Sequence, residues 1–123
     1  MSLIGELPKL EVLKLRRYAF RGKLCYLSGA KFVRLRFLLL EDLDVKYWLA
    51  HWPDCFPVLK HLIIRHCYEL QDIIPTLDRV LTLGELEVDN CSLYTEDWAR
   101  EMEKRKNDGR FRVQIHSSKD VIQ

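Results

Sequence analysis

The sequence predicts an α/β solenoid in which parallel strands line one side and short helices or turns return along the other. One observation is a pattern of four apolar residues, apolar-xx-apolar-xx-apolar-x-apolar, which occurs four times in 123 residues. The other is its period. The last apolar positions of the four copies are Leu15, Leu40, Ile64 and Val88, so the pattern recurs at a nearly constant interval. That interval falls within the roughly 20 to 29 residues typical of leucine-rich repeats.

Each copy of the pattern is expected to supply one strand. Two apolar residues one position apart, such as Leu13 and Leu15, point to the same side of a strand, and stacked strands then bury an apolar ladder that no single repeat could bury alone. We expect strands near 12–16, 37–41, 61–65 and 85–89. The pattern positions are Leu7, Leu10, Leu13 and Leu15; Phe32, Leu35, Leu38 and Leu40; Phe56, Leu59, Leu62 and Ile64; and Val80, Leu83, Leu86 and Val88.

Two cysteines follow the third and fourth predicted strands. Cys67 and Cys91 occupy the position where the repeat pattern places Asn or Cys. We expect both thiols to turn inward and to donate weak hydrogen bonds to backbone carbonyls of the next turn of the solenoid. With Cys25 and Cys55 they are spread along the chain, so reduced cysteines are expected rather than disulfides.

The return segments differ from repeat to repeat. In the second repeat, residues 45–52 have apolar residues at helical spacing and precede Pro53, which predicts a short helix. In the third, residues 70–74 precede Pro75, which favours a tighter turn.

The tail departs from the repeat and predicts a C-terminal cap over 95–116. Thr95 is expected to cap a helix that ends in a basic last turn, Lys104–Lys106, which suits the helix dipole. Phe111, Val113 and Ile115 then alternate with polar residues, as in a half-buried strand.

The whole chain is expected to form a single leucine-rich-repeat domain over 1–123. Its repeats lie around 7–31, 32–55, 56–79 and 80–94, followed by the cap at 95–116 and a tail at 117–123. Because the pattern is already present at Leu7, we expect the chain to be the end of a longer array; the alternative is that Met1–Glu6 forms a minimal cap.

Charge and hydropathy limit the functions that are possible. Lys and Arg number 20 against 18 Asp and Glu, and a net charge of +2 is too small to predict nucleic-acid binding or attraction to an anionic membrane. No apolar run approaches the roughly 20 residues that span a bilayer, and no basic-then-apolar leader opens the chain. We expect a soluble, cytoplasmic protein.

Residues between the inward apolar positions are predicted to form a protein-binding concave face. Its first strand is basic, its second and third expose apolar groups, and its fourth is acidic, a combination typical of protein interfaces. The alternative is a solvated sheet face with isolated hydrophobes. The candidate residues are Lys14, Arg16, Phe37, Leu39, Glu41, His61, Ile63, Arg65, Glu85, Glu87 and Asp89, flanked by Val12 and by Arg112, Gln114 and His116 of the cap.

No catalytic arrangement stands out, so an enzyme is not expected, nor is any cofactor or metal. The cluster nearest to metal-ligand spacing is Cys55, His61, His66 and Cys67. The repeat register turns His61 outward and Cys67 inward, so these residues cannot converge on one tetrahedral ion.

Four stretches resemble the last repeats of plant nucleotide-binding leucine-rich-repeat disease-resistance proteins, of the coiled-coil, late-blight-resistance-like type. They are LPKLEVLKL at 7–15, RLRFLLLEDLDVKYW at 34–48, FPVLKHLIIRHCYEL at 56–70 and LEVDNC at 86–91. The resemblance implies a protein–protein interaction module that helps to recognise pathogen effectors or to hold the receptor inactive through its own nucleotide-binding module. The alternative is a stand-alone repeat scaffold or substrate-recruiting adaptor.

The chain departs from this family in two ways. Cys25 and Tyr26 stand where related repeats often carry a Trp-Glu pair. The five glycines never produce the G-x-x-x-x-G-K-[ST] spacing that cradles phosphates, so the receptors' ATP binding does not carry over to this chain.

Overall fold

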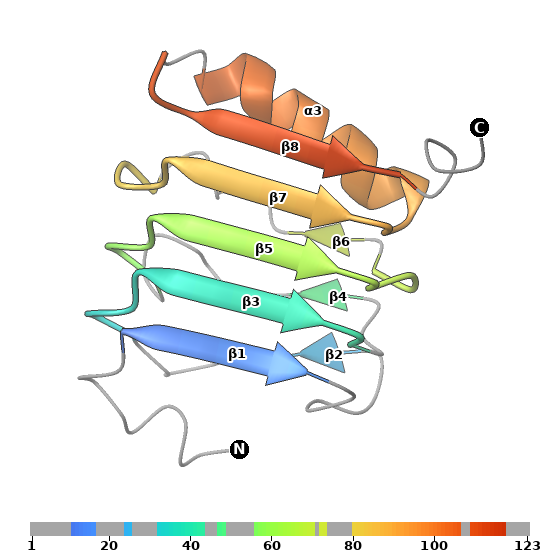
Figure 1. Ribbon diagram of the computed structural model, residues 1–123, viewed down its shortest axis with the longest axis horizontal. Coiled ribbons are helices and arrows are strands. Elements are labelled where there is room, and N and C mark those ends of the chain that lie inside the picture. Colours follow the sequence, from blue (N-terminus) through green and yellow to red (C-terminus); the bar gives the residue numbers. More distant parts are fainter. Residues whose placement is uncertain are drawn as a thin grey trace.

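In the residues that it describes, the computed structural model shows an α/β fold of two parallel sheets and one helix (Figure 1). The described residues are 11–16, 24–25, 32–43, 47–48, 56–70, 72–73, 80–106 and 109–117. The larger sheet has five strands in the order β1-β3-β5-β7-β8, and the smaller has three in the order β2-β4-β6. The strands of the larger sheet are β1 (Val12–Arg16), β3 (Phe37–Glu41), β5 (His61–Arg65), β7 (Glu85–Asp89) and β8 (Arg112–His116).

The four repeat strands begin and end at the residues that the pattern predicts. Each pairs in parallel with the next, and the register joins equivalent positions of successive repeats, as in Leu15 beside Leu40 and Leu40 beside Ile64. The predicted strand of the cap, β8, completes the row beside β7. This one-strand-per-repeat arrangement is compatible with a leucine-rich-repeat fold.

The first half of the apolar pattern forms a tight turn before β3, β5 and β7. The N–H of Leu35 donates to the carbonyl of Phe32 at 3.2 Å, and Leu59 and Leu83 repeat this bond to Phe56 and Val80. Both ends of these turns are buried. The apolar-xx-apolar spacing therefore places two side chains in the core, while the residues between them are exposed or, at Val58, half-buried.

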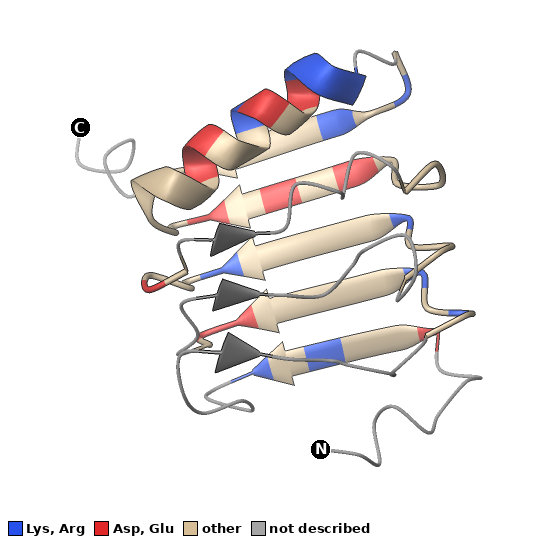
Figure 2. Ribbon diagram, turned by 180° about the vertical axis from the view of Figure 1, so that it is seen from behind, with Lys and Arg blue, Asp and Glu red and all other residues tan. Residues whose placement is uncertain are grey.

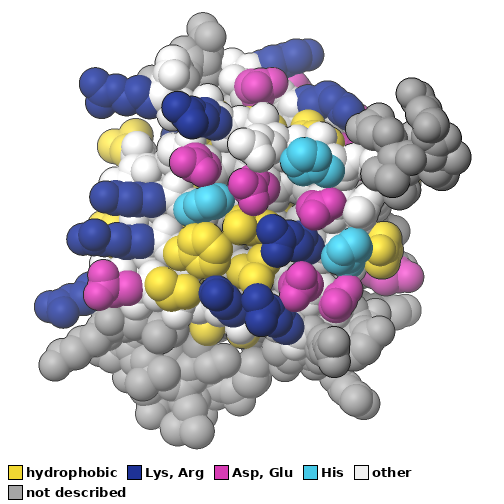
Figure 3. Space-filling model, viewed as in Figure 1, with side chains coloured by type: hydrophobic (Ala, Val, Ile, Leu, Met, Phe, Trp, Pro, Cys, Tyr) yellow, Lys and Arg dark blue, Asp and Glu magenta, His cyan; other side chains and the backbone are white. Residues whose placement is uncertain are grey.

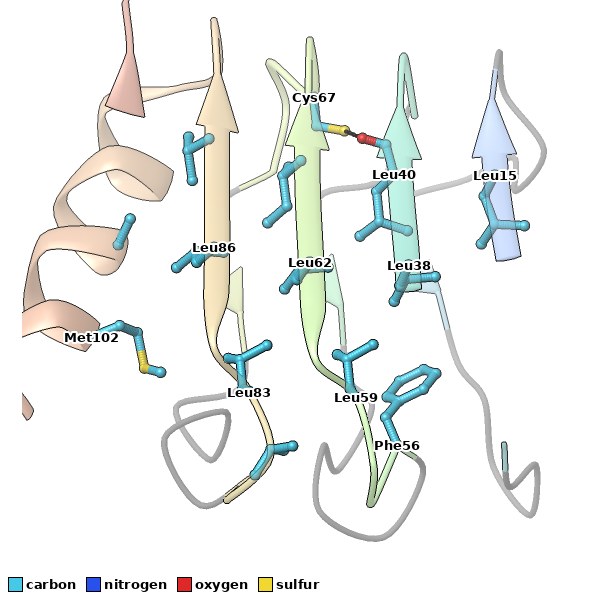
Figure 4. Close-up of a cluster of buried hydrophobic side chains, with 14 of the residues drawn as sticks. Leu15, Leu38, Leu40, Phe56, Leu59, Leu62, Cys67, Leu83, Leu86 and Met102 are labelled. Carbon is cyan, nitrogen blue, oxygen red and sulfur yellow. Dashed lines mark hydrogen bonds between the residues drawn. The ribbon is translucent and has the colours of Figure 1, made fainter. Parts of the chain in front are cut away.

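The core lies behind the five-stranded sheet (Figure 4). Leu38, Leu62 and Leu86 occupy one row of the register and are 0% exposed. At the turns, the rings of Phe32 and Phe56 stack with centroids 5.4 Å apart. Side chains of successive repeats thus contact one another rather than those of their own repeat alone, which is how a stacked array buries its apolar surface.

The return segments form strands where the sequence predicted helix and turn. β2 (Leu24–Cys25), β4 (Tyr47–Trp48) and β6 (Asp72–Ile73) pair in parallel across the back of the larger sheet (Figure 2). The helix predicted over 45–52 is therefore wrong at 47–48, and the tighter turn at 70–74 is wrong at 72–73. The other residues of those segments lie outside the described ones, except Leu70, which is buried.

The reason is a competition between local and long-range bonding. Apolar residues at helical spacing favour a helix only when the backbone has no other partner, whereas here Tyr47 lies between Leu24 and Asp72 in the register of a second sheet. Repeat stacking supplies that partner, and local periodicity carries no information about it.

Between β7 and β8 the chain forms α3 (Leu93–Lys106), which packs behind these two strands (Figure 1). The predicted cap residue is wrong. Ser92 caps the helix, because its Oγ accepts a hydrogen bond from the N–H of Thr95 at 3.3 Å. Thr95 is instead buried inside the first turn of the helix, which begins at Leu93.

Two carbonyls of earlier repeats hold α3 at its ends. The hydroxyls of Ser92 and Thr95 both donate to the carbonyl of Leu70, at 2.8 and 3.3 Å. At the other end, Lys106 Nζ donates to the carbonyl of Val80 at 3.2 Å and lies 5.2 Å from the ring centroid of Phe111. The basic last turn of the helix therefore has a structural role.

The residue after each of β3, β5 and β7 has a left-handed backbone. Asp42, His66 and Asn90 have φ values of 54°, 52° and 53°. These three residue types tolerate that region best among non-glycine residues. Each N–H donates to the carbonyl of the last residue in the next strand, as from His66 to Asp89 at 2.9 Å. The conformation thus adds one backbone bond between strands beyond the ladder.

We expect Leu62→Ala to lower the free energy of unfolding by about 2 to 5 kcal/mol, because it leaves a cavity in the centre of the core. Leu81→Ala removes the same atoms from a side chain that is 91% exposed and should change stability by less than about 0.5 kcal/mol. Urea titration followed by circular dichroism measures both. Equal losses in the two variants would contradict the assigned core.

We expect Asn90→Val to lower the free energy of unfolding by about 1 to 2 kcal/mol, because a branched side chain fits poorly at positive φ. Asn90→Gly should stay within about 1 kcal/mol of the parent, since glycine adopts this conformation freely. Thermal unfolding of the two variants compares them. If valine were tolerated as well as glycine, residue 90 would not be left-handed.

Candidate protein-binding face

The predicted binding residues lie together on one side of the five-stranded sheet, opposite the core. We call this side the sheet face. The register arranges it in three rows that cross all five strands. The rows are Val12, Phe37, His61, Glu85 and Arg112; Lys14, Leu39, Ile63, Glu87 and Gln114; and Arg16, Glu41, Arg65, Asp89 and His116.

The third row alternates in charge from strand to strand. Arg16 Nε lies 3.1 Å from Glu41 Oε1, Glu41 Oε2 lies 4.0 Å from Arg65 Nη1, and Arg65 Nε lies 3.6 Å from Asp89 Oδ2. Each separate surface pair contributes little to stability, but a connected series fixes the side chains in place. The four groups leave this edge of the face nearly neutral.

The apolar centre of the face is more covered than the sequence predicts. Leu39 and Ile63 are only 2% and 7% exposed, so the expectation that both are exposed is wrong. In the register they are flanked by Phe37 and His61 on one side and by Glu41 and Arg65 on the other. These longer side chains cover them, and Figure 3 shows hydrophobic groups gathered between histidine and charged groups.

His61 and Glu85 of the first row form a His–Glu cluster with Glu87 of the second row. The ring of Phe37 meets that of His61 edge-on, with centroids 5.1 Å apart. His61 Nε2 then lies 3.6 Å from Glu85 Oε2 and 3.8 Å from Glu87 Oε1, distances too long for hydrogen bonds. That nitrogen is buried, and no hydrogen-bond partner reaches it within the described chain.

The sequence analysis placed His61, Glu85 and Glu87 on the sheet face but did not predict that their side chains lie close together. The signal was present, since His61 and Glu85 occupy the same position in successive repeats and are therefore one period apart. Glu87, two positions further along the same strand, shares the face with Glu85.

The cysteines point the other way, as predicted. Cys67 Sγ donates to the carbonyl of Leu40 at 3.6 Å (Figure 4), and Cys91 Sγ to that of Ile64 at 3.4 Å. Both acceptors belong to the preceding repeat, not to the next one. Burial raises the pKa of Cys67 to about 12 and that of Cys91 to about 11, which leaves both thiols protonated and unreactive near neutral pH.

The Cys and His cluster considered from the sequence does not assemble in the described residues. His61 is on the sheet face and Cys67 is in the core. His66 is engaged elsewhere, with its Nδ1 2.8 Å from the hydroxyl of Tyr68. Cys55 lies outside the described residues.

A groove of about 390 Å³ runs along the edge where the strands begin. Arg36 and Lys60, which precede β3 and β5, are exposed there. The spacing of these basic residues equals the period of the repeat, yet sequence analysis did not predict the groove. Its lining consists of Glu11, Val33, Arg34, Arg36, Val58, Lys60 and Thr82.

Comparison with known proteins identifies relatives from one plant. The chain is 38% identical over 88 residues to putative late blight resistance protein homolog R1B-12 of Solanum demissum, a match that covers 71% of this chain and 6% of the relative. It is 34% identical over 87 residues to homolog R1B-13 of the same species, with 70% of this chain and 8% of the relative covered. A third homolog from this plant is 33% identical over 101 residues, which covers 80% of this chain and 13% of the relative. No protein-family model matches the chain.

The expected resemblance to late-blight-resistance proteins is thereby confirmed. The chain spans about 6 to 13% of the length of the relatives compared above. Within the described residues, no helix has the length and apolar character needed to cross a membrane.

We expect Cys67 and Cys91 to resist iodoacetamide at pH 8 in the folded chain, because only thiolates react and burial holds the pKa of both near 11 to 12. In urea both should be alkylated, which peptide mass spectrometry quantifies. Since burial lifts the pKa of each thiol above its ordinary value of 9.0, ionisation should also favour unfolding as pH rises from 9 toward 12. Equal labelling of Cys67 with and without urea would place its thiol outside the core.

Proposed function

We propose that this chain, a relative of the late blight resistance protein homologs, is a leucine-rich-repeat segment of a plant intracellular immune receptor and binds protein through its sheet face. The bound partner is either the receptor's own nucleotide-binding module or a pathogen effector. The supporting relatives are named as resistance proteins, which favours a receptor segment over a stand-alone adaptor.

The observation that carries the proposal is the uneven charge of the sheet face. Lys14 and Arg16 make β1 basic, the third row is internally paired, and Glu85, Glu87 and Asp89 make β7 acidic. A face that is basic on β1 and acidic on β7, the fourth of its five strands, orients a charged partner.

The centre of the face supplies the apolar area that such an interface needs. Phe37 is half-buried beside the covered Leu39 and Ile63, so modest movement of the long side chains around them would expose an apolar platform. Interfaces commonly combine an apolar centre with a polar rim. The rim here is already arranged by the ion pairs of Arg65 with Glu41 and Asp89.

The test is charge reversal of the acidic strand in a full-length receptor that contains this chain. Replacing Glu85, Glu87 and Asp89 together by Lys should either trigger cell death without a pathogen, if the face holds the receptor inactive, or abolish the response, if it contacts an effector. A leaf transient-expression assay measures both. The reversal changes the charge of a partly exposed surface and should leave the core intact.

The matched control makes the same change in charge away from the sheet face. Asp97, Glu101 and Glu103 are exposed on α3, and replacing all three by Lys should leave both responses unchanged. Immunoblotting confirms equal protein levels. If the β7 variant keeps normal autoinhibition and normal recognition, the sheet face does not bind the partner.

A further inference from the structure

The His–Glu cluster of the sheet face has the form of a metal site. His61 on β5 and Glu85 and Glu87 on β7 each offer one ligand atom, and all three atoms lie within 4.8 Å of one another. The cluster differs from the cysteine and histidine set considered from the sequence, because it arises from cross-strand register. Only the fold brings its members together.

The spacing of the atoms suits a small divalent ion. Zn²⁺ bound at about 2.0 to 2.1 Å in tetrahedral geometry keeps its ligand atoms about 3.4 Å apart. His61 Nε2 is 3.6 Å from Glu85 Oε2 and 3.8 Å from Glu87 Oε1, so small side-chain rotations would bring these atoms into range. The backbone need not move, because paired strands hold all three residues.

The electrostatics also favour a cation at this point. Two carboxylates lie on the same side of β7, and His61 is the one described residue whose side-chain nitrogen is recorded within 4.0 Å of them. Arg112 is next to Glu85 in the register, but it is exposed and makes no ion pair with either glutamate in the described structure. Arg65 is already paired with Glu41 and Asp89.

His61 is prepared to act as a ligand. Its Nε2 is buried and has no hydrogen-bond partner within the described residues, although a buried polar atom normally has one. The edge-on contact with Phe37 limits rotation of the ring and aims this nitrogen at β7. A metal ion between His61 and the glutamates would give the nitrogen a partner and would offset the repulsion between the two carboxylates.

We propose that His61, Glu85 and Glu87 bind one divalent transition-metal ion, of which Zn²⁺ is the test case. One imidazole and two carboxylates match the preference of Zn²⁺ for mixed nitrogen and oxygen ligands, whereas Mg²⁺ and Ca²⁺ prefer oxygen alone. Three protein ligands leave at least one position for water. The proposal does not depend on the partner binding proposed above.

The experiment is calorimetric titration of the full, reduced chain with ZnCl₂, compared with His61→Asn and Glu87→Gln. The parent chain should bind one equivalent at this site, and each variant should weaken that binding by about tenfold or more. His66→Asn and Glu103→Gln remove a histidine and a carboxylate away from the sheet face, so they should leave the affinity unchanged within about twofold. Circular dichroism confirms that all variants fold.

Titration with Co²⁺ separates this site from the cysteines. Binding at His61, Glu85 and Glu87 gives only the visible bands of nitrogen and oxygen ligation, whereas a thiolate ligand adds a strong charge-transfer band in the near ultraviolet. Visible Co²⁺ bands that are unchanged in His61→Asn would overturn the proposal. So would the absence of saturable Zn²⁺ binding, or an affinity that is the same in the parent chain and in His61→Asn.

Discussion

Parallel backbone hydrogen bonds hold equivalent positions of successive repeats side by side, and both faces of the sheet depend on this alignment. On the buried face it joins Leu38, Leu62 and Leu86 into one continuous row. On the other face it produces the alternating charges around Arg65 and brings His61 to the carboxylates of β7. A shift of one residue would move every side chain of a strand to the opposite face, so the same register maintains the core and the surface together.

The alignment is reinforced at both ends of the strands. In the turns before β3, β5 and β7, both apolar end residues are buried, and the carbonyl of Arg36 accepts bonds from the N–H groups of both Lys60 and His61 of the next repeat. After β3, β5 and β7, a left-handed residue such as Asn90 donates its N–H to the neighbouring strand. The protonated thiols of Cys67 and Cys91 add bonds to the preceding repeat. These contacts run between repeats, so a repeat is held chiefly by its neighbours.

The sequence predicted the features that local spacing determines. Strand ends and the inward direction of Cys67 follow from a period-two pattern that recurs once in every repeat. The strand at Tyr47 and Trp48 was missed, because its partners lie a whole repeat away in either direction. The cap at Ser92 was missed for a related reason: Thr95, although a good capping residue, is held inside the first turn by its bond to Leu70.

The candidate site also has features that the sequence predicted and features that it did not. Which residues lie on the sheet face follows from alternation along each strand, but burial of Leu39 and Ile63 depends on side chains from several strands and could not be predicted one strand at a time.

The constant register between successive strands also bears on how such a surface could diversify. Unequal recombination that adds or removes one whole repeat would lengthen or shorten the array without changing which side chains face outward. A gene built from such units could acquire a new combining surface in a single genetic event, with the fold unchanged.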